Sequence, residues 1–245
     1  MRDDDRTVGR VLSRRELVGL LGLSGVAVLI DPLRAQAPAA SGSAPVCVVQ
    51  PEQTEGPYFS DVMLNRVDVR SDPPSSAPKP GARLDLTFNV TQMGANGACT
   101  ALAGAHVDIW QCDAVGVYSD AKDALFNTIG QKFLRGYQLT DTNGAARFTT
   151  IYPGWYPGRA VHIHFKIRTN PKAPAGQEFT SQLYFDEALT DRVHAAPPYA
   201  SKGKGRTLNE QDGIFKKGGR QLVLAVSEKS GGYAGAFNVA LVKKT

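Results

Sequence analysis

Histidine is scarce in this chain, and its scarcity limits the kinds of metal site that the chain can build. The 245 residues include only four histidines, which are His106, His162, His164 and His194. A copper/zinc superoxide dismutase needs more histidines than these. A cupin needs a glutamate shortly after its His-x-His pair, and residues 166–170 contain none. A closed zinc site would need cysteines or a third histidine at suitable spacing. Further metal ligands must therefore come from another residue type.

Cysteine is also rare, with three residues at Cys47, Cys99 and Cys112. Three cysteines allow one disulfide and leave one free thiol, and the sequence does not choose the pair. A disulfide would suit an oxidising compartment. No histidine stands near Cys112 at the spacing of a nucleophile motif, so we expect a structural role for Cys112.

The apolar run from Leu17 to Ile30 is shorter than the about 20 residues that a membrane-spanning helix needs. It follows a twin-arginine pattern, Ser13–Leu17, and precedes an A-x-A cleavage site at Ala35–Ala37. We therefore predict a signal segment at residues 1–37 and a linker at 38–50. This signal predicts a periplasmic or extracellular protein, with no stable membrane association once the signal is removed. An uncleaved membrane anchor is the alternative.

The net charge of +5 at pH 7 is modest and is not concentrated in one segment. No known nucleic-acid-binding motif and no interleaving of basic and aromatic residues is present, so we do not expect a nucleic-acid partner. Acidic small molecules could still be favoured by the positive field. Residues 51–245 have the length of one domain with a sizeable core.

The rest of the chain shows short alternating segments separated by turns, with little helical periodicity. This pattern predicts a mainly β, single-domain sandwich of the immunoglobulin or transthyretin type with long irregular loops. Asp141–Gly144 is a turn signal, and Glu187–Val193 could form a short helix. Strands are expected at residues 84–91, 105–111, 146–151, 162–167, 179–185, 221–227 and 236–242.

Two of the four histidines stand at the start of the most regular strand pattern. From His162 to Ile167 polar and apolar residues alternate, so His162 and His164 point to one face and can converge on one metal ion. Tyr156 lies just upstream in a turn-rich segment, and its phenolate is a hard anionic oxygen donor of the kind that binds iron in catalase. A second tyrosine, Tyr118, follows the strand at 105–111 and a turn at Gly116.

Three motifs together resemble one family, the intradiol ring-cleavage dioxygenases, which include the protocatechuate 3,4- and catechol 1,2-type enzymes. They are Thr54–Tyr58, the segment from Asp108 to Tyr118, and the segment from Pro153 to His164. The resemblance covers about residues 51–242, and it is strongest to exported, single-chain members. The catechol 1,2-type enzymes carry a helical linker that dimerises them. This chain has no room for one, so that dimer is not expected and the oligomeric state is left open.

The resemblance implies a non-haem Fe(III) enzyme that uses O2 to open a catechol ring to a muconate-type diacid. It implies that Tyr156 also acts in catalysis and that Arg159 and Gln182 line the substrate side. The iron ligands implied by the resemblance are Tyr118, Tyr156, His162 and His164. The substrate wall that it implies is formed by Gly56, Pro57 and Tyr58, with Tyr199 as a further candidate.

Two other interpretations remain open at the level of sequence. The chain could be a non-catalytic sandwich that binds catechols or sugars, or an exported accessory domain whose His-x-His pair binds copper or zinc adventitiously. The first would keep its binding without Tyr156 and Arg159, and the second would be insensitive to Tyr118→Phe. No residue in the sequence dictates a carboxylated over a plain catechol.

Overall fold

The computed structural model describes residues 47–75, 77–171 and 176–242, which fold as two β-sheets packed face to face. The predicted signal segment, residues 1–37, and the first part of the predicted linker, residues 38–46, lie outside the described residues. Within the described ranges, no helix is both long and apolar enough to cross a membrane.

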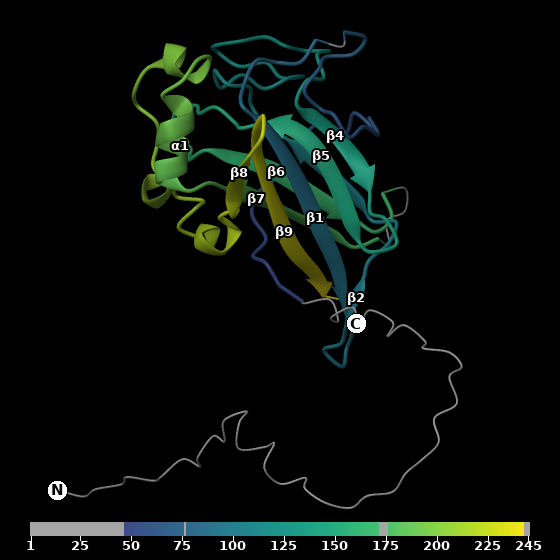
Figure 1. Cartoon of the computed structure of the whole chain (residues 1–245). Coiled ribbons are helices and arrows are strands. Elements are labelled where there is room, and N and C mark those ends of the chain that lie inside the picture. The colour runs from purple at the N-terminus through teal and green to yellow at the C-terminus, as the bar shows by residue number, and fades with distance from the viewer. Residues whose placement is uncertain (1–46, 76, 172–175, 243–245) are drawn as a thin grey trace, which may run out of the picture. The chain divides into compact units, whose positions relative to one another are not determined.

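The first sheet is built around β1 (Arg83–Met93), which pairs with three other strands. Along one edge β1 runs parallel to β9 (Gly232–Val242), and β8 (Val226–Lys229) continues the sheet beyond β9. Along the other edge β1 pairs antiparallel with β5 (Ala145–Ile151) and β2 (Cys99–Ala101). Figure 1 shows β9, β1 and β5 side by side in front of β6 and β7.

The second sheet is antiparallel throughout, in the order β4 (Arg135–Leu139), β3 (His106–Trp110), β6 (His162–Arg168), β7 (Glu178–Tyr184). The predicted histidine strand is therefore confirmed as β6, a central strand. Its register places His164 opposite Trp110 on one side and opposite Gln182 on the other. On that second side β6 and β7 are adjacent antiparallel strands.

Apolar side chains on the facing surfaces of the two sheets form one continuous core. Phe165 of β6 contacts Phe88 of β1, with ring centroids 5.1 Å apart, and Phe237 of β9, at 5.6 Å. The predicted mainly β sandwich is thus confirmed. The alternation from His162 to Ile167 has the predicted sense, because Ile163, Phe165 and Ile167 all belong to this core.

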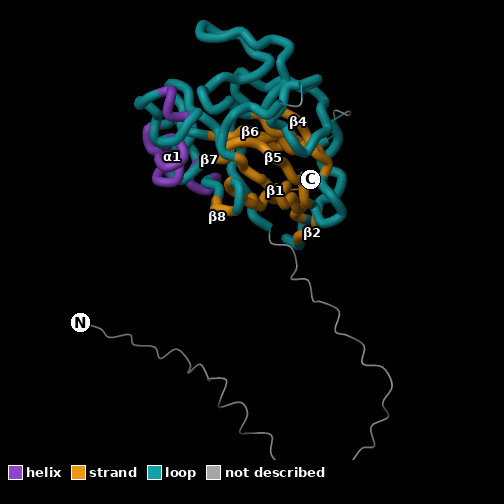
Figure 2. Tube along the Cα trace, turned by 45° about the horizontal axis from the view of Figure 1, so that its top comes forward, coloured by secondary structure: helices purple, strands orange, loops and turns teal. Residues whose placement is uncertain are grey.

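The opposite face of β6 is buried as well, although it carries polar residues. A smaller cluster of Trp110, Cys112, Tyr118 and Ala121 lies on this side, with Phe59 packed on Trp110 at 4.9 Å between ring centroids. Figure 2 shows the helices gathered beside β7 and β8, whereas loops occupy the region beyond β6 and β4. Loops therefore enclose the polar face of the sheet.

The predicted helix is present as α1 (Glu187–His194), and its first turn is capped by the Asp186 carboxylate, which accepts from Leu189 N–H at 2.8 Å. The predicted strand at 221–227 is wrong in its first half. Gly218 has φ +93°, and a short 3₁₀ helix, Gly219–Leu222, follows it before β8 begins at Val226. The two adjacent glycines favour this turn over an extended start.

The disulfide joins Cys47 to Cys99, and Cys112 is the buried free thiol. The described end of the predicted linker, residues 47–50, is held against β9. Ala240 N–H donates to the Val48 carbonyl at 2.8 Å, and the Gln50 amide donates to the Asn238 carbonyl at 3.0 Å. These residues are therefore attached to the sandwich rather than separate from it.

Candidate metal and substrate site

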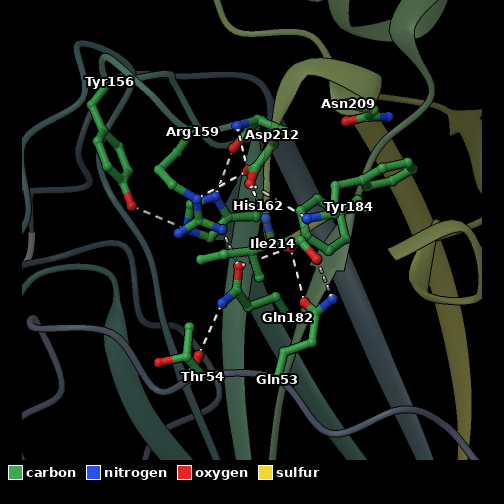
Figure 3. A network of polar contacts seen from close by, with 12 residues as sticks. Gln53, Thr54, Tyr156, Arg159, His162, Gln182, Tyr184, Asn209, Asp212 and Ile214 are labelled. Carbon is green, nitrogen blue, oxygen red and sulfur yellow. Dashed lines mark hydrogen bonds and ion pairs between the residues drawn. The ribbon is translucent and has the colours of Figure 1, made fainter. Parts of the chain in front are cut away.

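Two imidazoles and two phenols converge on the polar face of β6. The Nε2 atom of His162 lies 3.0 Å from Nε2 of His164, 3.4 Å from the Tyr118 hydroxyl and 3.3 Å from the Tyr156 hydroxyl. Figure 3 shows the last of these contacts beside the surrounding polar network. The structure thus brings together the four side chains that the sequence proposes as metal ligands, from two loops and one strand.

The spacing and the protonation of these donors fit a shared cation. Donors that bind one ion at about 2.1 Å and at right angles lie about 3 Å apart. Nδ1 of His162 lies 2.6 Å from the Ala160 carbonyl, which can only accept, so His162 carries its proton there and presents the Nε2 lone pair to the site. Nδ1 of His164 is buried without a hydrogen-bond partner among the described residues.

Burial keeps both imidazoles neutral. It lowers the pKa of His162 to about 3, with the Arg159 charge adding to the effect, and holds the pKa of His164 well below its ordinary value. Neutral imidazole is the metal-binding form. No group of three His, Cys, Asp or Glu side chains in the described ranges could hold an ion. An ion bound to the two imidazoles would therefore need the two tyrosines as its other ligands.

The two phenols are strongly desolvated. Burial raises the pKa of Tyr156 to about 12, although the Arg159 charge opposes it, and holds the pKa of Tyr118 well above its ordinary value. Without a cation both side chains would stay protonated at neutral pH. A nearby positive ion favours phenolate, as it favours any anionic ligand.

Tyr118 is fixed by the loop between β3 and β4. Its carbonyl accepts from the Thr128 hydroxyl at 2.6 Å, and its ring stacks on Tyr58 with centroids 4.5 Å apart. Arg135, which sequence reasoning missed, ties these pieces together, because its guanidinium donates to the Ser119 hydroxyl at 2.7 Å and to the Tyr58 carbonyl at 3.1 Å. A lone arginine in a segment without apolar alternation gave no signal of this role.

Arg159 and Gln182 meet beside the imidazoles, as Figure 3 shows. The Arg159 guanidinium donates to Oε1 of Gln182 at 2.5 Å, and Nε2 of Gln182 donates to the Thr54 carbonyl at 2.9 Å. The β6–β7 register places Gln182 directly opposite His164.

Asp212 holds the other side of Arg159 and was missed by sequence reasoning. Its buried carboxylate accepts from Nε of Arg159 at 2.9 Å and from the N–H groups of Ala160 at 2.9 Å and Ile214 at 2.7 Å. Burial alone would raise the pKa of Asp212, but these hydrogen bonds and the Arg159 charge hold it below its ordinary value. The carboxylate is therefore ionised at neutral pH and fixes the guanidinium.

The predicted wall residues occupy different positions around the site. Gly56 has φ +73°, and a Cβ added there would come within 3.2 Å of the His164 ring, so a side chain at this position would crowd the site. Tyr58 stacks on Tyr118, whereas Pro57 is exposed on the turn between Gly56 and Tyr58. Tyr199 is placed instead in the main core, where its hydroxyl donates to the Tyr152 carbonyl at 2.7 Å.

A cavity of about 410 Å³ opens beside the two candidate ligand tyrosines. Tyr58, Tyr118 and Tyr156 line it, together with apolar residues of the loops at 115–126 and Pro157. A cavity of this size, next to convergent polar groups, is the usual form of a small-molecule site.

Comparison with known proteins shows which family the chain resembles. The family model described as Dioxygenase matches residues 54–211. The chain is 32% identical to the protocatechuate 3,4-dioxygenase beta chain of Burkholderia cepacia over 135 residues, which are 51% of this chain and 54% of that protein. It is 30% identical to a chlorocatechol 1,2-dioxygenase of Pseudomonas putida over 103 residues, 35% of this chain and 36% of that protein. The match therefore spans about half of the first relative and a smaller part of the second.

Solved structures extend the likeness over most of the chain. An intradiol ring-cleavage dioxygenase from Tetranychus urticae is similar with a TM-score of 0.69 and 32% identity, covering 79% of this chain and 94% of that chain. The dioxygenase domain of a carbohydrate-binding fusion protein from Streptomyces sp. SirexAA-E is similar with a TM-score of 0.53 and 29% identity, covering 80% and 99%. The chain belongs to the intradiol ring-cleavage dioxygenase family.

Proposed function

We propose that this protein uses O2 to open the ring of a catechol between its two hydroxylated carbons, giving a muconate-type diacid, with a non-haem ferric ion held by Tyr118, Tyr156, His162 and His164. The observation that carries the proposal is the convergence of two phenols and a second neutral imidazole on His162, whose Nε2 lies 3.0–3.4 Å from Nε2 of His164 and from the hydroxyls of Tyr118 and Tyr156. Two anionic oxygen donors suit a hard trivalent ion. When bound, the ion would act as a Lewis acid toward a chelated catecholate.

The protein's own residues supply a path for substrate protons. A catechol has to lose two protons before both oxygens can bind a cation. The Tyr156 oxygen reaches the site from a half-buried side chain that also lines the cavity, so as a phenolate it could accept one of these protons, and the other would pass to solvent. Tyr118 is fully buried, its carbonyl accepts from Thr128 and its ring stacks on Tyr58. We therefore assign Tyr118 the role of a permanent ligand, in contrast to Tyr156.

Arg159 supplies a fixed positive charge beside the reacting ring. Its guanidinium is oriented by Asp212 and Gln182, so it needs no reorganisation as negative charge develops on the substrate carbon. Gln182 is itself held by the Thr54 carbonyl and fixes the guanidinium from the opposite side.

The decisive experiment is a visible spectrum of the iron-loaded protein, recorded without oxygen before and after catechol is added. We expect a tyrosinate-to-Fe(III) band that shifts to longer wavelength on chelation, and that fades in Tyr118→Phe. Oxygen consumption with a panel of catechols then tests turnover. A protein that stays colourless after iron reconstitution would overturn the proposal and favour a non-catalytic binding module.

We also propose that the chain is exported through its twin-arginine segment. The Arg14-Arg15 pair supports this address, and the disulfide between Cys47 and Cys99 suits an oxidising compartment. Fusing residues 1–37 to a folded reporter tests it. We expect the reporter outside the cytoplasm, with retention inside when Arg14 and Arg15 are both replaced by lysine. Unchanged export in that variant would contradict a twin-arginine route.

A further inference from the structure

The two charged residues that line the cavity of about 410 Å³ differ in whether other protein groups already bind their charges. The cavity lining contains one carboxylate, Asp123, and one ammonium group, Lys202. The Asp123 carboxylate accepts from Leu125 N–H at 2.6 Å, from Phe126 N–H at 3.1 Å and from the Tyr58 hydroxyl at 3.1 Å. It is occupied in holding its own turn and the Tyr58 ring.

Lys202, by contrast, has no ionic partner among the described residues. Its ammonium donates to the Val115 carbonyl and lies 4.8 Å from the centroid of the Trp155 ring. Two other cations in this part of the structure are paired with carboxylates. Lys166 contacts Glu55, and Arg206, in the same loop as Lys202, contacts Glu187. Within the described part of the chain, no carboxylate neutralises the Lys202 ammonium.

The surroundings hold this ammonium in place. Gly116, with φ +87°, lies against it, and a Cβ at that position would overlap both the Lys202 ammonium and the Trp155 carbonyl. One of the three N–H donors of the lysine is used by Val115, and another approaches the face of Trp155. The remaining donor capacity is available to a ligand in the cavity.

Most of the remaining lining is apolar. Val117, Leu125, Phe126 and Pro157 contribute to it, and Leu125 is 81% exposed on the free protein. The volume of about 410 Å³ also falls in the range of sites, about 300 to 1,000 Å³, that hold ligands larger than a single ring. The lining therefore matches a substituent with an apolar section and an anionic end.

We propose that Lys202 makes this site selective for catechols that carry a carboxylate at the end of a short carbon chain. The inference rests on the proposed function, because it names the substrate class of that site. The ring would occupy the end of the cavity next to Tyr118 and Tyr156. The chain would lie along the apolar lining, and the carboxylate would pair with the Lys202 ammonium.

The test compares two ligands that differ only at the end of the side chain, 3-(3,4-dihydroxyphenyl)propanoate and 4-propylcatechol. Binding is measured by calorimetry on the iron-loaded protein without oxygen, and kcat/KM is measured with oxygen. A charge-assisted hydrogen bond predicts that the acid is favoured about tenfold in both measurements. This advantage should shrink as salt is raised.

Lys202→Met retains an apolar stem of similar length and should reduce the preference to about one. Lys202→Arg keeps the charge and should retain most of the preference. The matched control is Lys204→Met, in the same loop but lining a different cavity, beside α1; it should keep the wild-type ratio. Circular dichroism confirms that each variant is folded, and if Lys202→Met does not fold, the wild-type preference and its salt dependence decide the question.

Equal binding of both ligands by the wild type, or a full preference retained in folded Lys202→Met, would overturn the inference. These results are distinguishable from a failure of the proposed function. If catechol is cleaved but the acid has no advantage, only the assignment of Lys202 is wrong. If neither catechol nor either ligand is cleaved while the acid binds more tightly through Lys202, the selectivity stands and the catalytic proposal fails.

Discussion

The two faces of β6 are equally buried, but they are buried by different means. On one face Ile163, Phe165 and Ile167 pack against the opposite sheet. On the other face His162 and His164 are covered by the phenols of two loops and by the Trp110 ring of β3. One face needs only apolar contact, whereas every polar group on the other needs a specific partner. One strand thus supports the fold on one side and the chemistry on the other.

Removing a candidate metal ligand should distinguish the roles of the two faces most clearly. We expect His164→Ala to lose bound iron and to lower kcat/KM by more than about 100-fold, since changes outside the ligand shell of metal sites already cost 10- to 100-fold. Iron analysis and oxygen consumption measure both effects. His106→Ala is the matched control, because His106 is also buried and stacks on Tyr137 with ring centroids 3.8 Å apart. Equal losses in the two variants would contradict the assignment.

The opposite face should show the reverse behaviour. Phe165→Ala removes the ring that joins Phe88 to Phe237 across the two sheets, and we expect it to lower the free energy of unfolding by about 3–5 kcal/mol. Urea unfolding followed by fluorescence measures the loss. Activity per folded molecule should stay near the wild-type value at low temperature. A variant of normal stability with reduced kcat would show that the two faces are not separable.

A smaller effect is expected where a loop residue orients a site residue. Asp212→Asn keeps the shape but removes the charge that holds Arg159, so we expect kcat/KM to fall about tenfold, mainly through kcat, at unchanged iron content. Glu210→Gln, which removes an exposed ion pair with Arg220, is the control and should have no effect on kcat. A lower melting temperature with normal kcat would assign Asp212 a purely structural role.

Alternation and turn signals predicted most of this architecture because they reflect local geometry. The inward face of β6, the turn at Asp141–Gly144 and the helix α1 all follow from side-chain period, a positive-φ glycine and a cap within a few residues. Tyr118 and Tyr156 stand beside recognisable motifs. That these tyrosines meet the histidines is a property of the fold, which the resemblance implied and the structure shows.

The parts that sequence missed depend on long-range partners. Arg135 reads as a surface residue, yet it is buried on β4 and joins two loops. Asp212 and Lys202 belong to an irregular segment without a motif, and they reach the site only because that segment folds back beside Arg159 and Trp155. The pairing of Cys47 with Cys99 likewise depends on β2 lying next to the first described residues. No local sequence pattern predicts these contacts between distant residues.

The smallest effect is expected for a charged pair on the polar face of β6, and it measures how much such charges stabilise the fold. Hydrogen bonds from Arg168 hold the pKa of Asp61 below its ordinary value, although partial burial opposes them. The depressed pKa means that this stabilisation is present above the unfolded pKa of about 3.9 and is lost as pH falls through the folded value. Because the Asp61 side chain is 40% exposed, we expect Asp61→Asn to cost no more than about 1 kcal/mol at pH 7. Urea midpoints for the two proteins should converge near pH 2. A difference that persists at low pH would show that Asp61 acts through packing, as the inner face does, rather than through charge.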